Sequence, residues 1–273
     1  MPRRDDRGSL SLEMHAQPDD TTCGPTCLHA VYRFWGMPYT LERVIAETSR
    51  LEDGGTLAVF LAQHALRNGF SASIYTFNVN LFDPTWFPRG GGVADAVLLA
   101  EKLKQQAARK HSRKLRIATD AYLDFLELGG RVHMEDLTGE LIRSHLRRQV
   151  PLLAGLSATY LYGAAREVEA PHNRMVDDDL GGEPTGHFVA LAGWDRERRE
   201  VLVVDPHSPD GAADAGEARR YGVWIRKLVC AILIGVLTYD GNLLVLEPAG
   251  GTPPSDDRTR PKEKPDADRR RGR

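Results

Sequence analysis

The sequence predicts an α+β fold, in which helices come first along the chain and an antiparallel sheet follows. In the first half of the 273 residues, apolar side chains recur at the three- and four-residue spacing of helices packed on a core. Near residue 190 the pattern changes to two apolar segments, HFVALAGW and EVLVVDP, joined by a short charged turn. Helices that precede a separate antiparallel sheet are typical of the α+β class.

The first predicted element is a helix over residues 24–35. Pro25 suits its first turn because proline lacks the N–H that would be unpaired there, and Gly36 suits its end. The next elements are expected to be helices over 41–51 and 56–69 and an alternating strand over 70–77.

The middle of the chain predicts a mainly helical region, residues about 90–150, followed by a buried strand. Helices are expected over 93–111, 119–128 and 138–149, and a strand over 151–157. A long polar loop over about 160–184 then precedes the two strands near residue 190, and it is either a lid over a cleft or a plain surface loop. Late strands are expected near 231–237 and 242–247.

Composition and charge narrow the classes of protein that fit. The formal net charge is −2, which does not indicate a nucleic-acid or membrane-surface partner, and the longest apolar run has 10 residues, too short to span a bilayer. Three cysteines without a secretion signal fit a reducing, cytoplasmic location. We expect a flexible arm over 1–11, a single domain over 12–248 and a disordered, polar tail over 249–273. The oligomeric state leaves no signal in the sequence.

Residues 17–27, QPDDTTCGPTC, place Cys23 at the start of the first predicted helix. Thiols at helix N-termini form the reactive thiolate more readily, because the positive end of the helix dipole favours it. Gln17 lies six residues upstream, and a side-chain amide can donate a hydrogen bond to an oxyanion. The segment therefore indicates a nucleophilic thiol, provided that the chain also supplies a base.

The predicted hairpin near residue 190 supplies that base. Its turn is centred near residue 197, so antiparallel pairing sets His187 opposite about residue 207 and makes Asp205 its near or diagonal neighbour. Such neighbours have Cβ atoms roughly 5–8 Å apart. A carboxylate at that distance can orient the imidazole, as the third member of a catalytic triad does.

Gln17 to Gly36 resembles the start of C39-type cysteine peptidases, and HFVALAGWD and VLVVDP resemble the histidine and aspartate segments of that family. The resemblance implies a papain-like cysteine peptidase fold with Cys23 as nucleophile, His187 as general base, Asp205 as its orienter and Gln17 as oxyanion donor. It implies a peptide or protein substrate and no cofactor or metal.

Two departures from the family pattern alter what the resemblance implies. Thr22 stands where the transporter-fused leader peptidases usually have aspartate, and the helical region about 90–150 is extra. Both favour a standalone enzyme whose substrate pocket is built by the insertion. A phytochelatin synthase-like transpeptidase that makes a new amide would use the same residues, and a catalytically silent peptide-binding module would keep the same fold.

The remaining cysteines and histidines favour structural interpretations. Cys27, one helical turn after Cys23, could join it in a zinc site but is expected to be a small buried residue, and Cys230 in an apolar run is expected in the core. His172 and His207 could line the site but are expected on the surface, and His29 and His64 are expected to be structural or exposed. The cap of the first helix is expected to come from Thr21, Thr22, Asp19 or Asp20.

Overall fold

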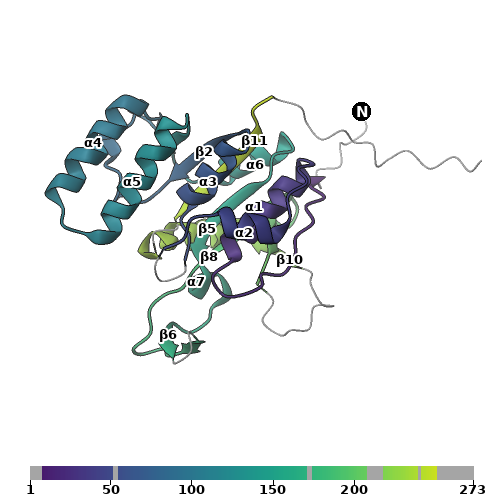
Figure 1. Ribbon diagram of the computed structural model, residues 1–273. Coiled ribbons are helices and arrows are strands. Elements are labelled where there is room, and N and C mark those ends of the chain that lie inside the picture. The colour runs from purple at the N-terminus through teal and green to yellow at the C-terminus, as the bar shows by residue number, and fades with distance from the viewer. Residues whose placement is uncertain (1–7, 52–54, 171–173, 208–217, 239–240, 251–273) are drawn as a thin grey trace, which may run out of the picture.

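The protein is built around a mixed sheet with helices on both faces (Figure 1). The computed structural model describes residues 8–51, 55–170, 174–207, 218–238 and 241–250. The strands run in the order β10-β9-β8-β5-β11-β2-β4-β3, with β1 added to β8, and all pairs are antiparallel except β2 with β4. The α+β class predicted from the sequence is confirmed.

The helices are α1 (Cys23–Phe34), α2 (Leu41–Glu47), α3 (Ala58–Arg67), α4 (Ala96–Arg109), α5 (Arg113–Glu127), α6 (Gly139–Arg147), α7 (Ala158–Tyr162) and α8 (Ile225–Ile234), with 3-10 turns η1 (Pro84–Trp86) and η2 (Gly235–Thr238). The strands of the main sheet are β1 (Gly8–Ser9), β2 (Phe70–Thr76), β3 (Gly92–Val93), β4 (Arg131–Met134), β5 (Leu152–Ser157), β8 (Gly186–Asp195), β9 (Glu200–Asp205), β10 (Arg219–Trp224) and β11 (Asn242–Pro248). A separate hairpin consists of β6 (Glu167–Ala170) and β7 (Arg174–Asp177).

The centre of the sheet is covered on both faces. All six residues of β5 are buried, and because successive side chains of a strand point to opposite faces, both faces must be packed. Helix α1 packs on β8 and α3 on β2 and β11, whereas α8 packs on β5. In Figure 1, α1, α2 and α3 lie in front of the sheet.

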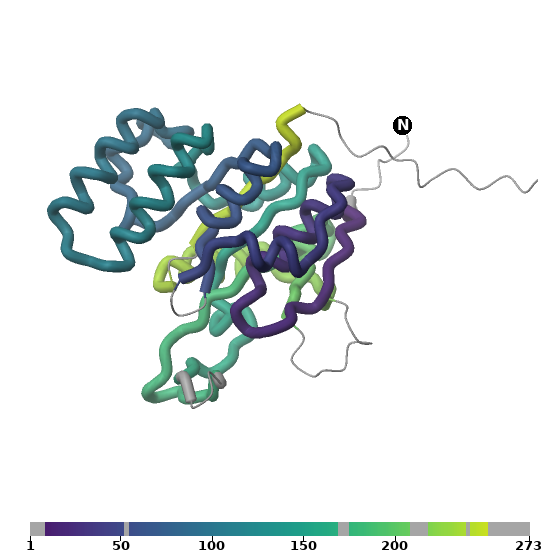
Figure 2. The backbone as a smooth tube through the Cα atoms, viewed as in Figure 1, coloured from purple at the N-terminus to yellow at the C-terminus, as the bar shows by residue number. Residues whose placement is uncertain are grey.

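The N-terminal segment joins the sheet at residues 8 and 9. Gly8 and Ser9 pair with Trp194 and Gly193, and Leu10 is 3% exposed. The described part of the expected arm therefore differs from a flexible segment, because an apolar side chain and a strand edge hold it. Figure 2 shows this part of the backbone running alongside the later strands.

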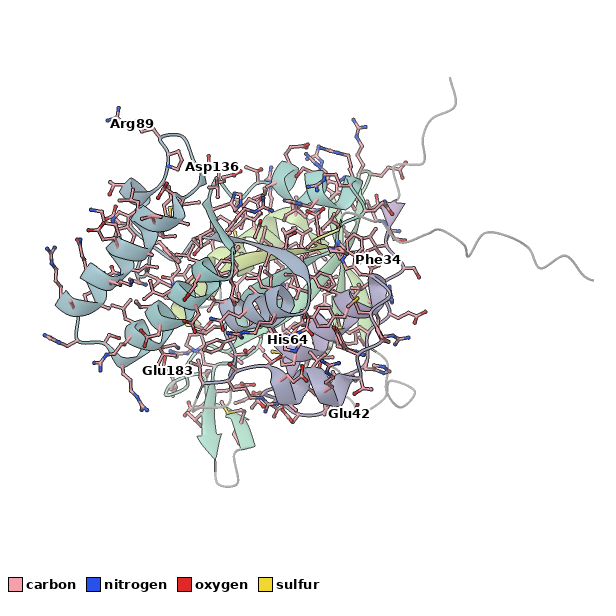
Figure 3. All side chains as sticks on the ribbon, turned by 45° about the horizontal axis from the view of Figure 1, so that its top comes forward. Phe34, Glu42, His64, Arg89, Asp136 and Glu183 are labelled. Carbon is pink, nitrogen blue, oxygen red and sulfur yellow. The ribbon has the colours of Figure 1, made fainter. Side chains whose placement is uncertain are left out.

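The helical region about 90–150 is divided over the sheet. Helices α4 and α5 lie with β4 and β3 at one edge, whereas α6 packs on the central strands β5 and β8. The sequence did not predict β3 and β4. Because β5, β11 and β2 separate β4 from β8, the α4–α5 hairpin stands away from α1 (Figures 1 and 3). In Figure 3, Arg89 and Asp136 project from this side, whereas Phe34 of α1 lies across the molecule. The expectation that this insertion builds a pocket at Cys23 is wrong for α4 and α5.

The C-terminal third corrects one prediction and adds elements. Residues 225–234 form helix α8 instead of a strand over 231–237, since Leu228, Ala231 and Ile232 face the core at helical spacing. The expected loop over 160–184 contains α7 and the β6–β7 hairpin, which extends from the lower side in Figure 1. Strand β10 was also not predicted. No helix within the described ranges is long and apolar enough to cross a membrane.

Candidate active site

Cys23 is the first residue of α1 and is half-buried. Thr22 occupies the N-cap position, but no side chain makes a cap hydrogen bond to this helix. Asp19 instead caps the preceding turn, where its Oδ1 accepts from the Thr21 N–H at 2.8 Å and the Thr21 hydroxyl at 2.7 Å. The expected side-chain cap is therefore not formed, and the N–H groups of the first turn are left for another acceptor.

Gly24 lets α1 approach the sheet closely at this point. A Cβ atom placed on it would lie 2.5 Å from the Thr56 Cγ2. It would also lie 3.3 Å from the Leu61 Cδ1 and 3.3 Å from the Phe188 Cδ2. A contact under 3 Å forces the buried neighbours to move. The Cys-Gly pair thus sets the thiol against the strand that carries His187.

Gly24→Ala is expected to lower the free energy of unfolding by about 1–3 kcal/mol, the usual effect of overpacking a filled core. Urea unfolding of the variant measures this change. Gly36→Ala is a poor control because Gly36 has a φ of 77°. Gly250, which has open space around it and no positive φ, is the matched control and should change little. An unchanged midpoint for Gly24→Ala would contradict the close approach.

His187 and Asp205 form a buried pair across the β8–β9 hairpin. The His187 Nε2 lies 2.9 Å from the Asp205 Oδ1, and the two side chains are 8% and 0% exposed. Ala190 pairs with Val204, so the same register sets residue 187 opposite residue 207. That is the register predicted from the turn. The pairing steps by one residue between Leu191 and Gly193, and this irregularity restores the predicted alignment.

The surroundings of His187 favour its protonated form. Burial lowers the pKa of the imidazole, but the charge of Cys23 and the hydrogen bonds with Asp205 and Cys23 outweigh burial and raise the pKa to about 10. Since Asp205 takes Nε2, the nitrogen available to the Cys23 thiol is Nδ1. An imidazole held between a carboxylate and a thiol can take the thiol proton and return it to another atom.

Asp205 is surrounded by further donors that the sequence analysis did not identify. Its Oδ2 accepts from the Tyr162 hydroxyl at 2.7 Å and the Tyr221 hydroxyl at 2.5 Å, and Arg219 lies 3.5 Å away. Its Oδ1 also accepts from the His207 N–H at 2.9 Å. Burial raises the pKa of this carboxyl, but the hydrogen bonds and the charge of His187 hold it well below its usual range.

Gln17 is tied to the same end of the sheet but not to the thiol itself. Its backbone N–H donates to the Pro206 carbonyl at 2.9 Å, directly after Asp205. Its side-chain Nε2 donates to the Asp19 carbonyl at 3.0 Å, and its Oε1 is buried without a partner. The turn 17–22 therefore connects Gln17 to Cys23, and one N–H of the amide is left for another acceptor.

Cys27 and Cys230 differ in their exposure to solvent. Cys27 is buried, its thiol donates to the Phe188 carbonyl at 3.3 Å, and burial raises the pKa of this thiol well above its usual value. Cys230 is exposed, so its expected place in the core is wrong. The reason is that residues 225–234 form a helix, whose spacing turns Leu228 and Ala231 inward and Cys230 outward.

Of the other described histidines discussed above, two are buried away from the His187–Asp205 pair and one lies beside it. His29 and His64 are buried, and His64 Nδ1 lies 2.7 Å from the Tyr32 hydroxyl. His207 is half-buried, with its ring centre 6.1 Å from that of His187, so it lines the site instead of lying on the surface. His172 lies outside the described residues. Among the residues described, no three His, Cys, Asp or Glu side chains are placed to hold a metal ion.

A hollow of about 850 Å³ lies beside α7 and α8. Ser157, Tyr160, Lys227 and Ile234 are among the residues that line it. Tyr162 of the same short helix α7 contacts Asp205.

The comparisons with known proteins give distant similarities in structure. The chain is similar to a candidate C39-like peptidase from Bacillus anthracis, with 12% identity, a TM-score of 0.46, and 89% of this chain and 98% of that chain covered. It is also similar to the peptidase domain of Streptococcus ComA, a bifunctional ABC transporter of a quorum-sensing pathway, with 13% identity, a TM-score of 0.36, and 87% and 98% covered. No protein-family model and no curated protein matches the chain.

Proposed function

We propose that the chain is a C39-like cysteine peptidase that hydrolyses a peptide or isopeptide bond, with Cys23 as the nucleophile. The observation that carries the proposal is the arrangement of three groups. Cys23, at the uncapped start of α1, interacts with His187, and the other nitrogen of His187 is held 2.9 Å from a fully buried carboxylate of Asp205. This is the relation of nucleophile, base and orienter that thiol catalysis requires.

In the proposed acylation step, the proton of Cys23 already lies on His187 Nδ1, in keeping with the raised pKa of the imidazole, and the sulfur attacks the carbonyl carbon of the substrate. The negative charge then develops on the carbonyl oxygen, where the N–H of Cys23 and the side-chain amide of Gln17 are the proposed donors. Such use of Gln17 requires its amide to offer the N–H that Asp19 does not take. When the C–N bond breaks, the amine leaves with the proton that His187 returns.

In the deacylation step, water attacks the thioester carbonyl while His187 takes one of its protons. The C–S bond breaks, the carboxylic acid is released, and the proton stays on His187 beside the thiolate, which restores the starting state. Asp205 keeps the imidazolium formed in each step oriented and stabilised. The proposed substrate is therefore a peptide or protein that presents an amide carbonyl to the half-buried sulfur of Cys23.

Alkylation by iodoacetamide at pH 6 tests the thiolate without knowledge of the substrate. An ordinary thiol with a pKa near 8.5 is only about 0.3% thiolate at this pH. We expect Cys23 to react at least about tenfold faster than Cys230, which is exposed and serves as the reference thiol within the same chain. Mass spectrometry of digested protein measures both rates. The advantage should disappear in His187→Ala.

The control for this experiment is His29→Ala, which removes a buried histidine away from the pair. It should leave the ratio of the two alkylation rates unchanged. Cys23 reacting no faster than Cys230 in the unmodified chain would contradict the proposal and favour a silent peptide-binding module.

A further inference from the structure

The two oxygens of Asp205 have different partners. Oδ1 lies 2.9 Å from the His187 Nε2 and accepts from the His207 N–H, whereas Oδ2 accepts from both tyrosine hydroxyls. A carboxylate that held only His187 could rotate about its last bond and exchange its oxygens. Two donors on Oδ2 make one orientation much more favourable than the other, because a rotated carboxylate would lose both of them.

Tyr162 reaches Asp205 from α7, a five-residue helix that is held at both ends. The Ser157 Oγ accepts from the Tyr160 N–H, and Gly163 closes the helix with a φ of 68°. Thr159 Oγ1 also accepts from the Thr185 N–H at 2.9 Å, two residues before His187. The tyrosine is thus anchored to the strand that carries the imidazole.

Tyr221 reaches Asp205 from β10 on the other side. Arg219 is paired with Asp205 and Tyr221 with Val203, so all four residues alternate onto one face of the β9–β10 pair. Tyr221 is therefore the diagonal neighbour of Asp205, within reach of a long aromatic side chain. The guanidinium of Arg219 lies 5.5 Å from the Tyr162 ring centre and 5.4 Å from that of Tyr221, and bridges the two rings.

Both phenols are protonated and act as donors at neutral pH. Burial, and next the charge of Asp205, raise the pKa of Tyr162 and of Tyr221 above the usual value, so each hydroxyl keeps its proton. An ionised carboxylate only accepts hydrogen bonds, which fixes the direction of both. Within the described ranges, Asp205 is faced by charged or titratable groups from every neighbouring element. These groups are His187 on β8, His207 after β9, Tyr162 on α7, Arg219 and Tyr221 on β10, and Cys27 on α1.

We propose that Tyr162 and Tyr221 are positioning residues that hold Asp205 ionised and turned toward His187, and so aim the Nδ1 of His187 at Cys23. The effect on Cys23 rests on the proposed function. The positioning of Asp205 by the two tyrosines does not depend on it. The two tyrosines touch neither the sulfur nor the reacting bond. They act through Asp205, and the loss of both should let the carboxyl take up a proton more easily.

The test is the double variant Tyr162→Phe/Tyr221→Phe, which keeps both rings and removes both hydroxyls. The matched control is Tyr160→Phe on the same helix, whose side chain is 41% exposed and interacts with Cys230 instead of Asp205. The first readout is the urea midpoint between pH 2 and 6. In the double variant, the midpoint should be lower than that of the unmodified chain at pH 6 and should fall less steeply in acid. The reason is that Asp205 loses two donors to its charged form, so its pKa in the folded state moves toward the value in the unfolded state.

The second readout is iodoacetamide alkylation of Cys23 as a function of pH. We expect the double variant to react about tenfold more slowly than the unmodified chain at pH 6 and at a similar rate near pH 9, where ordinary thiols ionise. Tyr160→Phe should follow the unmodified chain in both readouts. If the unmodified chain shows no fast thiol, the proposed function fails while the urea readout still decides the role of the tyrosines.

A merely structural role gives a different pattern. It would lower the urea midpoint of the double variant by the same amount at every pH and leave the shape of the alkylation profile unchanged. That outcome, or an equal effect of Tyr160→Phe, would overturn the proposal.

Discussion

Replacing Cys23 with alanine is expected to abolish peptide-bond cleavage, with a fall in kcat of about 10⁴-fold or more, the scale seen when a nucleophile is removed from a triad. The variant should stay folded, because the side chain is half-buried at the start of α1 and only one sulfur is lost. The measurement uses a library of tryptic peptides, with new termini counted by mass spectrometry after incubation with the purified chain.

The matched control for this prediction is Cys230→Ala, which removes an exposed thiol away from His187. It should cleave the library as the unmodified chain does. Cleavage by Cys23→Ala at the unmodified rate would exclude Cys23 as the nucleophile. A chain that joins the peptides to an added amine, with no hydrolysis product, would contradict hydrolysis and identify a transpeptidase.

Replacing Asp205 with alanine is expected to lower the free energy of unfolding by about 3–5 kcal/mol, the usual result of removing one partner of a buried charge pair. The variant leaves His187, Arg219 and two tyrosine hydroxyls facing a space that no longer holds an acceptor. Urea unfolding at pH 7 measures the effect. Asp120→Ala, at an exposed position of α5, is the control and should change little.

The same pair gives the stability of the unmodified chain a dependence on pH with a definite sign. The pKa of Asp205 is held below its usual range, so its contribution is present above about pH 4 and is lost as the pH falls further. The pKa of His187 is raised to about 10, so its contribution is present below about pH 6.5 and is lost as the pH rises through 10. In Asp205→Ala the first of these losses should be absent. A midpoint of that variant that falls in acid as steeply as the unmodified chain's would contradict the assignment.

Much of the fold and of the candidate site could be predicted from local patterns. The start of the first helix at Cys23 follows from the Cys-Gly-Pro sequence and the apolar spacing behind it. The near-neighbour relation of His187 to Asp205 follows from the position of one turn to within one residue, and the irregularity between Leu191 and Gly193 sets the final alignment. These features depend on residues close in sequence, which is why the sequence contains them.

Other features were predicted wrongly or not at all, and each has a non-local cause. Residues 228–237 are apolar throughout most of their length, and a short apolar run does not distinguish a strand from a helix. Residues 225–234 form a helix that packs on β5, and the helical spacing leaves Cys230 exposed. Strand β4 is too short to show a pattern, and it is a strand because β2 and β3 pair with it.

The sequence by itself determined the α+β class, the place of Cys23 on its helix and the alignment of His187 with Asp205. Only the tertiary structure decided which groups surround the carboxylate. Tyr162 and Tyr221 come from a five-residue helix and an edge strand, 43 and 16 residues away in sequence from Asp205, and no periodicity relates them to it. The physical reason is that a buried anion must find donors from whatever segments the fold brings beside it, and that choice is made by packing in three dimensions.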